Sequence, residues 1–215
     1  MRALARRFTV GLQSPRKTRR AIDMGRVREF MLDVPPEDNP WLIGGRALVY
    51  LVLVIWGIRF FLTPIDSDYW TRTFMHSVNL PFHEAGHILF SIFGIGLLGG
   101  SLMQLIVPLI CMGAFLRQRN LFAASVALWW LGQNFMDLSP YINDARSLKL
   151  LLLGGITGQE DPQFHDWHRI LGNIGWLKHD HAIARLSYGI GFILMTASLL
   201  WGGYVLQRQY RSARS

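Results

Sequence analysis

Hydrophobic residues gather in long segments that carry almost no charge. One segment runs from about residue 41 to 62 and is uncharged from 47 to 58, and another is uncharged over the 22 residues from 186 to 207. Between them, residues 88–116 include no charged side chain over 29 positions, and residues 121–136 form a further apolar segment. A helix needs about 20 apolar residues to cross a bilayer. The pattern therefore predicts an all-α, polytopic membrane protein with about four to five transmembrane helices.

The composition agrees with this pattern. The chain of 215 residues is 51% hydrophobic and contains eight tryptophans, which suit the two membrane–water interfaces. The single cysteine, Cys111, lies in an apolar segment. One cysteine excludes both an intramolecular disulfide and a cysteine-based metal cluster.

Positive charge is concentrated at the N-terminus. Nine of the 22 Lys and Arg residues fall within the first 28 positions of a chain whose net charge is +8. Ahead of membrane spans, such a basic arm usually anchors the cytoplasmic end to anionic lipid, so we expect membrane lipids as partners and no nucleic acid. Prolines and acidic residues at 34–40 then predict a stiff linker. We therefore divide the chain into a basic cytoplasmic arm with its linker, residues 1–40, and a single helical membrane domain, residues 41–215.

One short motif carries candidate chemistry, since residues 83–87 read His-Glu-Ala-Gly-His. In a helix, His83 and His87 lie one turn apart on one face, a spacing that lets two imidazoles hold one Zn²⁺. Glu84 is then placed to take a proton from the water that the metal binds. The uncharged residues 88–116 follow directly, which puts the motif at or within the membrane. Ionisable groups at that depth cost about 3 kcal/mol or more and usually persist for function.

The helix that carries the motif should begin near Pro81 and end near Phe93, because proline suits a first helical turn. Glycines at positions 94, 96, 99 and 100 then interrupt the apolar stretch. Residues 88–116 are barely long enough for two crossings. We therefore expect residues 94–116 to be partly re-entrant, leaving four crossings.

Four crossings place both termini in the cytoplasm and the loop from about 140 to 180 outside. The metal site would then lie in the outer half of the membrane. Five crossings would instead leave the carboxylates after residue 136 on the opposite side from His83.

A zinc site needs a third protein ligand, with water as the fourth. Asp137 and Asp144 follow the third apolar segment, and His165 and Asp166 lie further along in the sequence His-Asp-Trp-His. Each also has a structural interpretation. Asp137 could be a hydrated carboxylate at a helix end, and Asp144 could pair with Arg146 or cap the next helix. The histidines could be solvated side chains. The residues alone leave the choice open.

The motif and its surroundings resemble the site-2 protease family of intramembrane zinc metalloproteases. HEAGH on a membrane helix is followed by a glycine-rich break and then by Asn134, Pro140 and Asp144-Ala145-Arg146. That family pairs HExxH with a downstream Asn-x-x-Pro…Leu-Asp-Gly segment whose aspartate is the third ligand, where this sequence has Asn-Asp-Ala-Arg. The resemblance covers roughly residues 78–150. It implies that Asp144 completes the metal site and that Asn134 holds an unwound substrate backbone, although Asn134 would serve equally for an interhelical hydrogen bond.

The function that this resemblance implies is a zinc metallopeptidase-like hydrolase that cuts a transmembrane or membrane-anchored protein within or beside the bilayer. The chain is also similar to small bacterial membrane proteins with the same HExxH and Asp-Ala-Arg arrangement, which implies the bacterial inner (cytoplasmic) membrane. The alternative is a non-catalytic metal-binding membrane protein, either a sensor or an assembly factor, that retains HExxH. Glu84 discriminates between them, because a binding protein needs the histidines but no general base. A transporter with a histidine–carboxylate relay is a third interpretation.

Overall fold

The structure, a computed structural model, describes residues 24–214. The chain divides into two units, Met1–Asp33 and Val34–Ser215. In the first unit the described helix is α1 (Met24–Leu32). The basic runs at residues 6–7 and 16–20 lie outside the described residues, so lipid anchoring by the arm stays a prediction.

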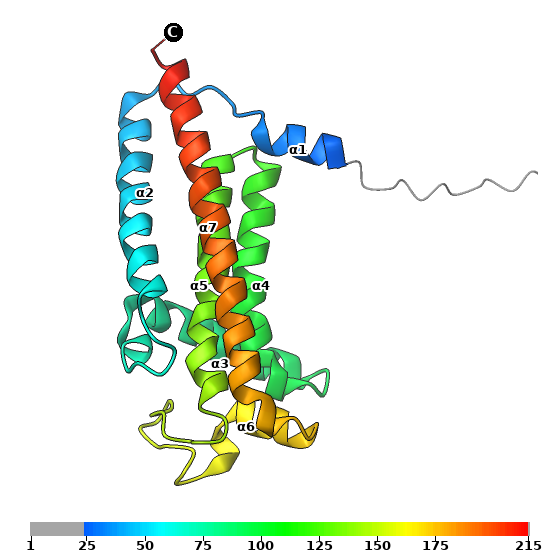
Figure 1. The fold of residues 1–215 in the computed structure, drawn as a ribbon. Coiled ribbons are helices and arrows are strands. Elements are labelled where there is room, and N and C mark those ends of the chain that lie inside the picture. Colours follow the sequence, from blue (N-terminus) through cyan, green and yellow to red (C-terminus); the bar gives the residue numbers. More distant parts are fainter. Residues whose placement is uncertain (1–23, 215) are drawn as a thin grey trace, which may run out of the picture. The chain divides into compact units, whose positions relative to one another are not determined.

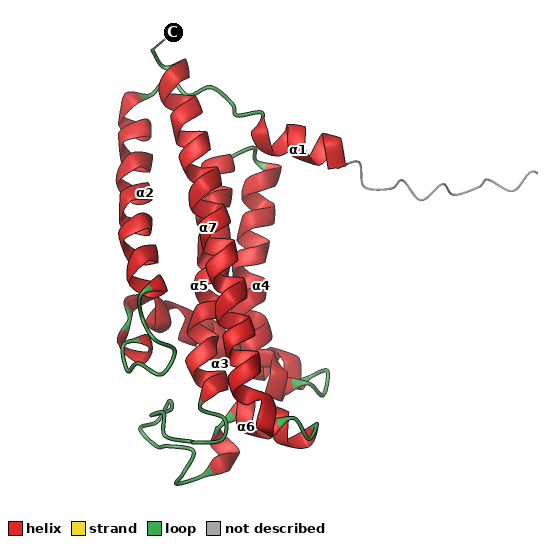
Figure 2. Cartoon of the chain, in the orientation of Figure 1, coloured by secondary structure: helices red, strands yellow, loops and turns green. Residues whose placement is uncertain are grey.

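Four long helices lie side by side in the second unit, and two shorter helices lie near one end of this bundle (Figure 1). The long helices are α2 (Pro40–Phe61), α4 (Gly96–Arg117), α5 (Leu121–Asn143) and α7 (Asp180–Ser212), and the shorter ones are α3 (Phe74–Ser91) and α6 (Asp166–Asn173). Three single-turn 3-10 helices complete the list: η1 (Trp70–Arg72), η2 (Pro162–Phe164) and η3 (Leu177–His179). Throughout the described residues the elements are helices joined by loops (Figure 2).

Among residues 24–214, three helical segments are long and apolar enough to cross a membrane, namely α2, α4 and residues 177–212. Large apolar side chains such as Leu51, Ile110 and Leu200 are exposed on them. Many exposed apolar side chains on long helices suit lipid rather than water. The protein is therefore an all-α membrane protein, as the hydrophobic pattern predicts.

Helix α5 is the interior helix of the bundle, with 16 of its 23 residues buried. It approaches α7 closely where Gly132 faces Gly191. A Cβ atom on Gly191 would lie 2.5 Å from the carbonyl oxygen of Gly132, so only glycine fits this contact. Because α5 is enclosed, its polar residues lie inside the protein, among them Gln133, Asn134 and Asp137.

Helix α3 begins earlier than its sequence suggests. The Thr73 side chain accepts a hydrogen bond from the backbone N–H of His76 at 3.0 Å, which is a standard helix N-cap. The helix therefore begins at Phe74, and Pro81 lies in its interior rather than in its first turn. The prediction missed this start because it took the proline as the start signal and overlooked the side-chain cap before it.

The glycine-rich stretch is a turn followed by one continuous helix. Gly94 adopts a positive φ of 74° between α3 and α4, a conformation that favours glycine. Helix α4 then runs without a break from Gly96 to Arg117, with Pro108 inside it. The predicted re-entrant form of residues 94–116 is therefore wrong. The element that does not extend along the bundle is α3, which lies near the end opposite the C-terminus (Figure 1).

The start of α2 and the end of α7 lie together at one end of the bundle. The Arg46 guanidinium donates hydrogen bonds to Oε1 of Gln209 at 2.9 Å and to Oε2 of Glu37 at 3.1 Å. Helix α6 and the loop that precedes it lie at the other end (Figure 1). This arrangement matches an even number of crossings, with α2, α4, α5 and α7 as the four long helices.

Candidate metal centre

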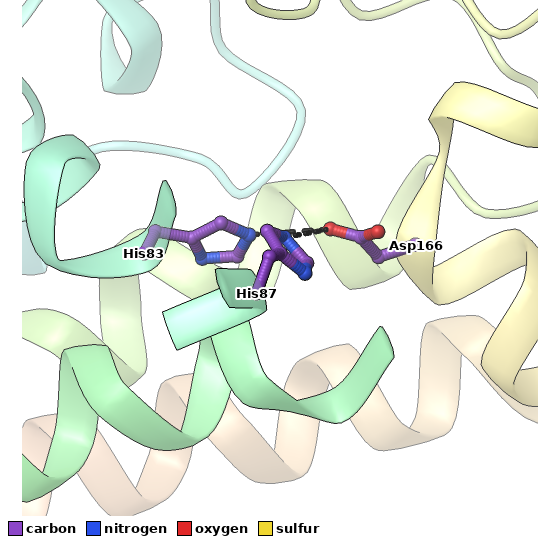
Figure 3. Close-up of side chains that lie close together, drawn as sticks. All are labelled: His83, His87 and Asp166. Carbon is purple, nitrogen blue, oxygen red and sulfur yellow. Dashed lines mark hydrogen bonds and ion pairs between the residues drawn. The ribbon is translucent and has the colours of Figure 1, made fainter. Parts of the chain in front are cut away.

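The two histidines of the HExxH motif lie on one face of α3, with ring centroids 5.0 Å apart. The carboxylate that meets them belongs to Asp166, the first residue of α6. Its Oδ2 lies 3.2 Å from Nε2 of His83 and 3.0 Å from Nε2 of His87 (Figure 3). Four ligands at about 2.0–2.1 Å from a tetrahedral zinc ion lie about 3.3 Å from one another. The two nitrogen–oxygen distances are close to this value, and the three ligand atoms all lie within 4.8 Å of one another.

Glycines on α4 make room for this cluster. A Cβ atom on Gly100 would lie 2.6 Å from Nε2 of both His83 and His87. At the neighbouring residue of α4, the two helices touch backbone to backbone. A Cβ atom on Gly86 of α3 would lie 2.1 Å from the carbonyl oxygen of Gly99. Of the glycines that the sequence presents as a helix break, Gly100 therefore lies against the imidazoles and Gly99 against the backbone of α3.

Each imidazole is oriented through its other nitrogen. Nδ1 of His87 lies 2.8 Å from the carbonyl oxygen of Gly96, and Nδ1 of His83 lies 3.0 Å from Oε1 of Gln104. Both partners are acceptors, so each Nδ1 carries a hydrogen and donates it. In a neutral imidazole this leaves a lone pair on Nε2, the atom that faces Asp166. A cation, or a proton, has to lie between each lone pair and the carboxylate, and outer contacts of this kind are typical of metal-binding histidines.

Asp166 is held as a charged group. Burial raises the pKa of this carboxyl, but the hydrogen bonds and charges of His83 and His87 lower it by more, so the pKa lies well below its usual range. Tyr141 fixes the carboxylate from the α5 side. Its hydroxyl donates to Oδ2 of Asp166 at 3.2 Å and accepts from the Asp166 backbone N–H at 2.8 Å.

The structure does not bring Asp144 to the histidines. The Asp144 carboxylate accepts hydrogen bonds from the backbone N–H groups of Lys149 and Leu150, both at 2.9 Å, and from the Ser147 hydroxyl. Nε2 of His165 lies 3.4 Å from its Oδ2. In the part of the chain that the structure describes, the histidine cluster contains Asp166 and not Asp144. Asp166 lies outside residues 78–150, the range that the sequence predicts as the core of the metal site.

Asp144-Ala145-Arg146 instead holds the segment that presents Asp166. Besides the contact between Asp144 and His165, the carbonyl oxygen of Ala145 accepts a hydrogen bond from Nδ1 of His168 at 2.8 Å. Arg146 pairs with the buried Asp180 at 2.8 Å, which ties residues 144–146 to the start of α7. The motif therefore lies beside the third group of the site without being part of it.

Two further predicted residues are buried away from the cluster. Asn134 is fully buried, and its Nδ2 donates to the carbonyl oxygen of Trp130 one turn earlier in α5, at 2.9 Å. This hydrogen bond lies within α5, so it is neither an interhelical bond nor a contact to a substrate. Asp137 is also buried and is linked to His83 only through Gln104.

Glu84 lies at the edge of the cluster. Its side chain is partly exposed, and its negative charge acts on both His87 and Tyr141. A cavity of about 380 Å³ opens next to His87 and Asp166, and Glu84 is not among the residues that line it. The other residues that line the cavity are Ser91, Gly94, Gly96, Leu97 and Arg169. The cluster is therefore accessible from this side.

Comparisons with models of known protein families, with curated proteins and with solved structures gave no match to this chain. The interpretation of the site consequently depends on its own geometry and chemistry.

Proposed function

We propose that His83, His87 and Asp166 hold Zn²⁺, and that the protein is a membrane-embedded zinc metallopeptidase-like hydrolase of the site-2 protease type. One observation carries the proposal. The Nε2 atoms of the two HExxH histidines on α3 converge with one carboxylate oxygen of Asp166 on α6. Two imidazoles and a carboxylate are a ligand set that zinc enzymes use, with the fourth position left open for chemistry. Such an ion supplies a Lewis acid that polarises a carbonyl group and acidifies water.

Glu84 provides the proton transfers that peptide hydrolysis needs. It takes one proton from the attacking water as the water oxygen bonds to the carbonyl carbon of the scissile peptide. When the C–N bond breaks, Glu84 gives that proton to the leaving amine. Its partial exposure and the effect of its charge on His87 support this role.

The substrate class follows from where the site lies. The cluster is near one end of a membrane bundle and faces a cavity of about 380 Å³. A peptide bond within a helix is shielded by the helix itself. We therefore propose a locally unwound segment of a transmembrane or membrane-anchored protein, cut within or beside the bilayer. With the basic arm in the cytoplasm of a bacterium, the site would lie in the outer half of the inner membrane, among its lipids.

Substitution of Glu84 by glutamine tests the proposal. Glu84→Gln should keep about one zinc per chain while hydrolysis of a membrane-anchored substrate falls by a factor of about 10²–10⁴ or more, because glutamine cannot take a proton. His83→Ala should lose the metal as well as the activity. Zinc is measured on detergent-purified protein and hydrolysis on cells that express tagged membrane proteins.

Two outcomes separate the alternatives. If Glu84→Gln supports every cellular phenotype of the wild type while His83→Ala does not, the protein is a metal-binding sensor or assembly factor. Folded wild-type protein without a stoichiometric transition metal would rule out both the metallopeptidase and the metal-binding protein.

A further inference from the structure

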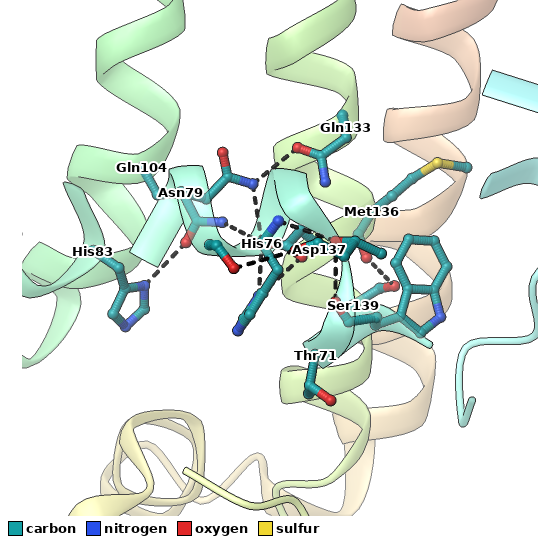
Figure 4. A network of polar contacts seen from close by, with 12 residues as sticks. Thr71, His76, Asn79, His83, Gln104, Gln133, Met136, Asp137 and Ser139 are labelled. Atoms are coloured by element: carbon teal, nitrogen blue, oxygen red, sulfur yellow. Dashed lines mark hydrogen bonds and ion pairs between the residues drawn. The ribbon is translucent and has the colours of Figure 1, made fainter. Parts of the chain in front are cut away.

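A buried chain of polar side chains leads away from His83 into the centre of the bundle (Figure 4). Nδ1 of His83 donates to Oε1 of Gln104 at 3.0 Å, and Nε2 of Gln104 donates to Oδ2 of Asp137 at 3.0 Å. Gln104 belongs to α4 and Asp137 to α5. Their exposures are only 4% and 5%, so water does not compete for these hydrogen bonds.

The two histidines differ in what decides their tautomer. His87 donates to the backbone carbonyl of Gly96, which offers only an acceptor. His83 faces a side-chain amide, which presents either its oxygen or its NH₂ group. With the NH₂ group toward His83, Nδ1 would accept, the ring hydrogen would move to Nε2, and Nε2 could not bind a metal.

Asp137 decides which way the Gln104 amide faces. A carboxylate only accepts, and this one receives hydrogen bonds from Gln104, from Nδ2 of Asn79 at 3.0 Å and from Nδ1 of His76 at 3.1 Å. The NH₂ group of Gln104 must therefore point to Asp137, which turns its oxygen toward His83. Asn79 and His76, both on α3, hold the carboxylate in this position.

We propose that Gln104 and Asp137 are positioning residues for the zinc site, which hold His83 in the one tautomer that leaves Nε2 free for the metal. The inference rests on the proposed function. It gives Asp137 a part in metal binding without contact to the ion. Outer partners of metal-binding histidines typically change metal affinity by 10–100-fold when they are replaced.

Zinc affinity of detergent-purified variants tests this assignment, by competition with a chromophoric chelator. Asp137→Asn allows both amide orientations and should bind zinc about 10-fold more weakly than the wild type. Gln104→Leu removes the acceptor of His83 altogether and should lose affinity by up to about 100-fold. The thermal unfolding of the metal-free variants is measured alongside.

An exchanged pair separates positioning from a merely structural role. Gln104→Glu combined with Asp137→Asn keeps the charge and swaps the carboxylate with the amide. The carboxylate at position 104 then accepts from His83 by itself, so the double variant should recover most of the affinity that Asp137→Asn loses.

Gln133→Leu is the matched control. Gln133 is one turn before Asp137 on α5, is fully buried, and accepts a hydrogen bond from Asn79 at 2.8 Å without touching Gln104. This variant disturbs the same polar network but leaves the path to His83 intact, so its zinc affinity should equal that of the wild type.

The outcomes distinguish the two proposals. A wild type that takes up no zinc overturns the metal site and this inference together. Zinc binding by the wild type, with equal affinity in Asp137→Asn or with no recovery in the exchanged pair, overturns the inference and leaves the metal site standing. Equal losses in Asp137→Asn and Gln133→Leu would also overturn it, because the network would then act only through stability.

Discussion

At the scale of single residues, Asp166 and Asp144 have different roles because different groups surround their carboxylates. Asp166 faces two imidazole Nε2 atoms within 3.2 Å. Asp144 faces backbone N–H groups of the loop that follows α5. The first arrangement is the cation site that we propose, whereas the second closes a turn of the chain.

This difference predicts opposite effects of two asparagine substitutions. Asp166→Asn should lower zinc affinity by more than about 100-fold, since the loss of a ligand exceeds the 10–100-fold typical of an outer partner. Asp144→Asn should keep about one zinc per chain but reduce the free energy of unfolding by about 1–3 kcal/mol, the cost of weakening hydrogen bonds to a buried carboxylate. Metal content and thermal unfolding of the same preparations check both effects. The assignment fails if Asp144→Asn loses its zinc while Asp166→Asn retains it.

At the scale of elements, the contact between α3 and α4 brings the imidazoles against a helix backbone. Gly100 lies against both Nε2 atoms, and the nearby contact between Gly86 and Gly99 leaves no gap between the helices. Side chains at these positions would force the helices apart or displace the rings, and overpacking of this kind costs about 1–3 kcal/mol.

Gly100→Ala is accordingly expected to weaken zinc binding by about 5- to 150-fold, because each 1.4 kcal/mol of misfit corresponds to a factor of ten. Gly113→Ala is the control on the same helix, where an added Cβ atom meets nothing within 4 Å. It should leave zinc affinity unchanged. Equal affinities in both variants would show that the imidazoles do not depend on this surface.

At the scale of the whole molecule, the four long helices put the start of α2 and the end of α7 at one end of the bundle and the candidate metal centre near the other (Figure 1). A membrane around this bundle separates the C-terminus from the loop between α5 and α6. The chemistry would therefore take place on the side of the membrane opposite the C-terminus.

Reporter fusions should find these two points on opposite sides of the membrane. A fusion after Ser215 is expected to be cytoplasmic, in keeping with the basic arm and with Arg208 and Arg211 near the C-terminus. A fusion inserted at Gly154 or Gly155, in the loop between α5 and α6, is expected to be outside. If both fusions were on the same side of the membrane, the single crossing by α7 between these two positions would be contradicted.

Much of the protein follows from its sequence, because the properties involved are local. Hydrophobic segments of about 20 residues predict membrane helices wherever they occur, and a spacing of four residues puts His83 and His87 on one helix face in any fold. The structure confirms the all-α membrane class and places these two imidazoles together.

Only the tertiary structure decides which carboxylate meets the histidines. Asp144 and Asp166 both follow α5, and no periodicity distinguishes them, since the answer depends on the path of the loop between α5 and α6. That path is set by contacts between residues far apart in sequence: Ala145 with His168, Arg146 with Asp180, and Tyr141 with Asp166. The same holds for the glycines after α3. In the sequence they interrupt an apolar stretch, whereas the packed helices use them to let α4 approach the imidazoles.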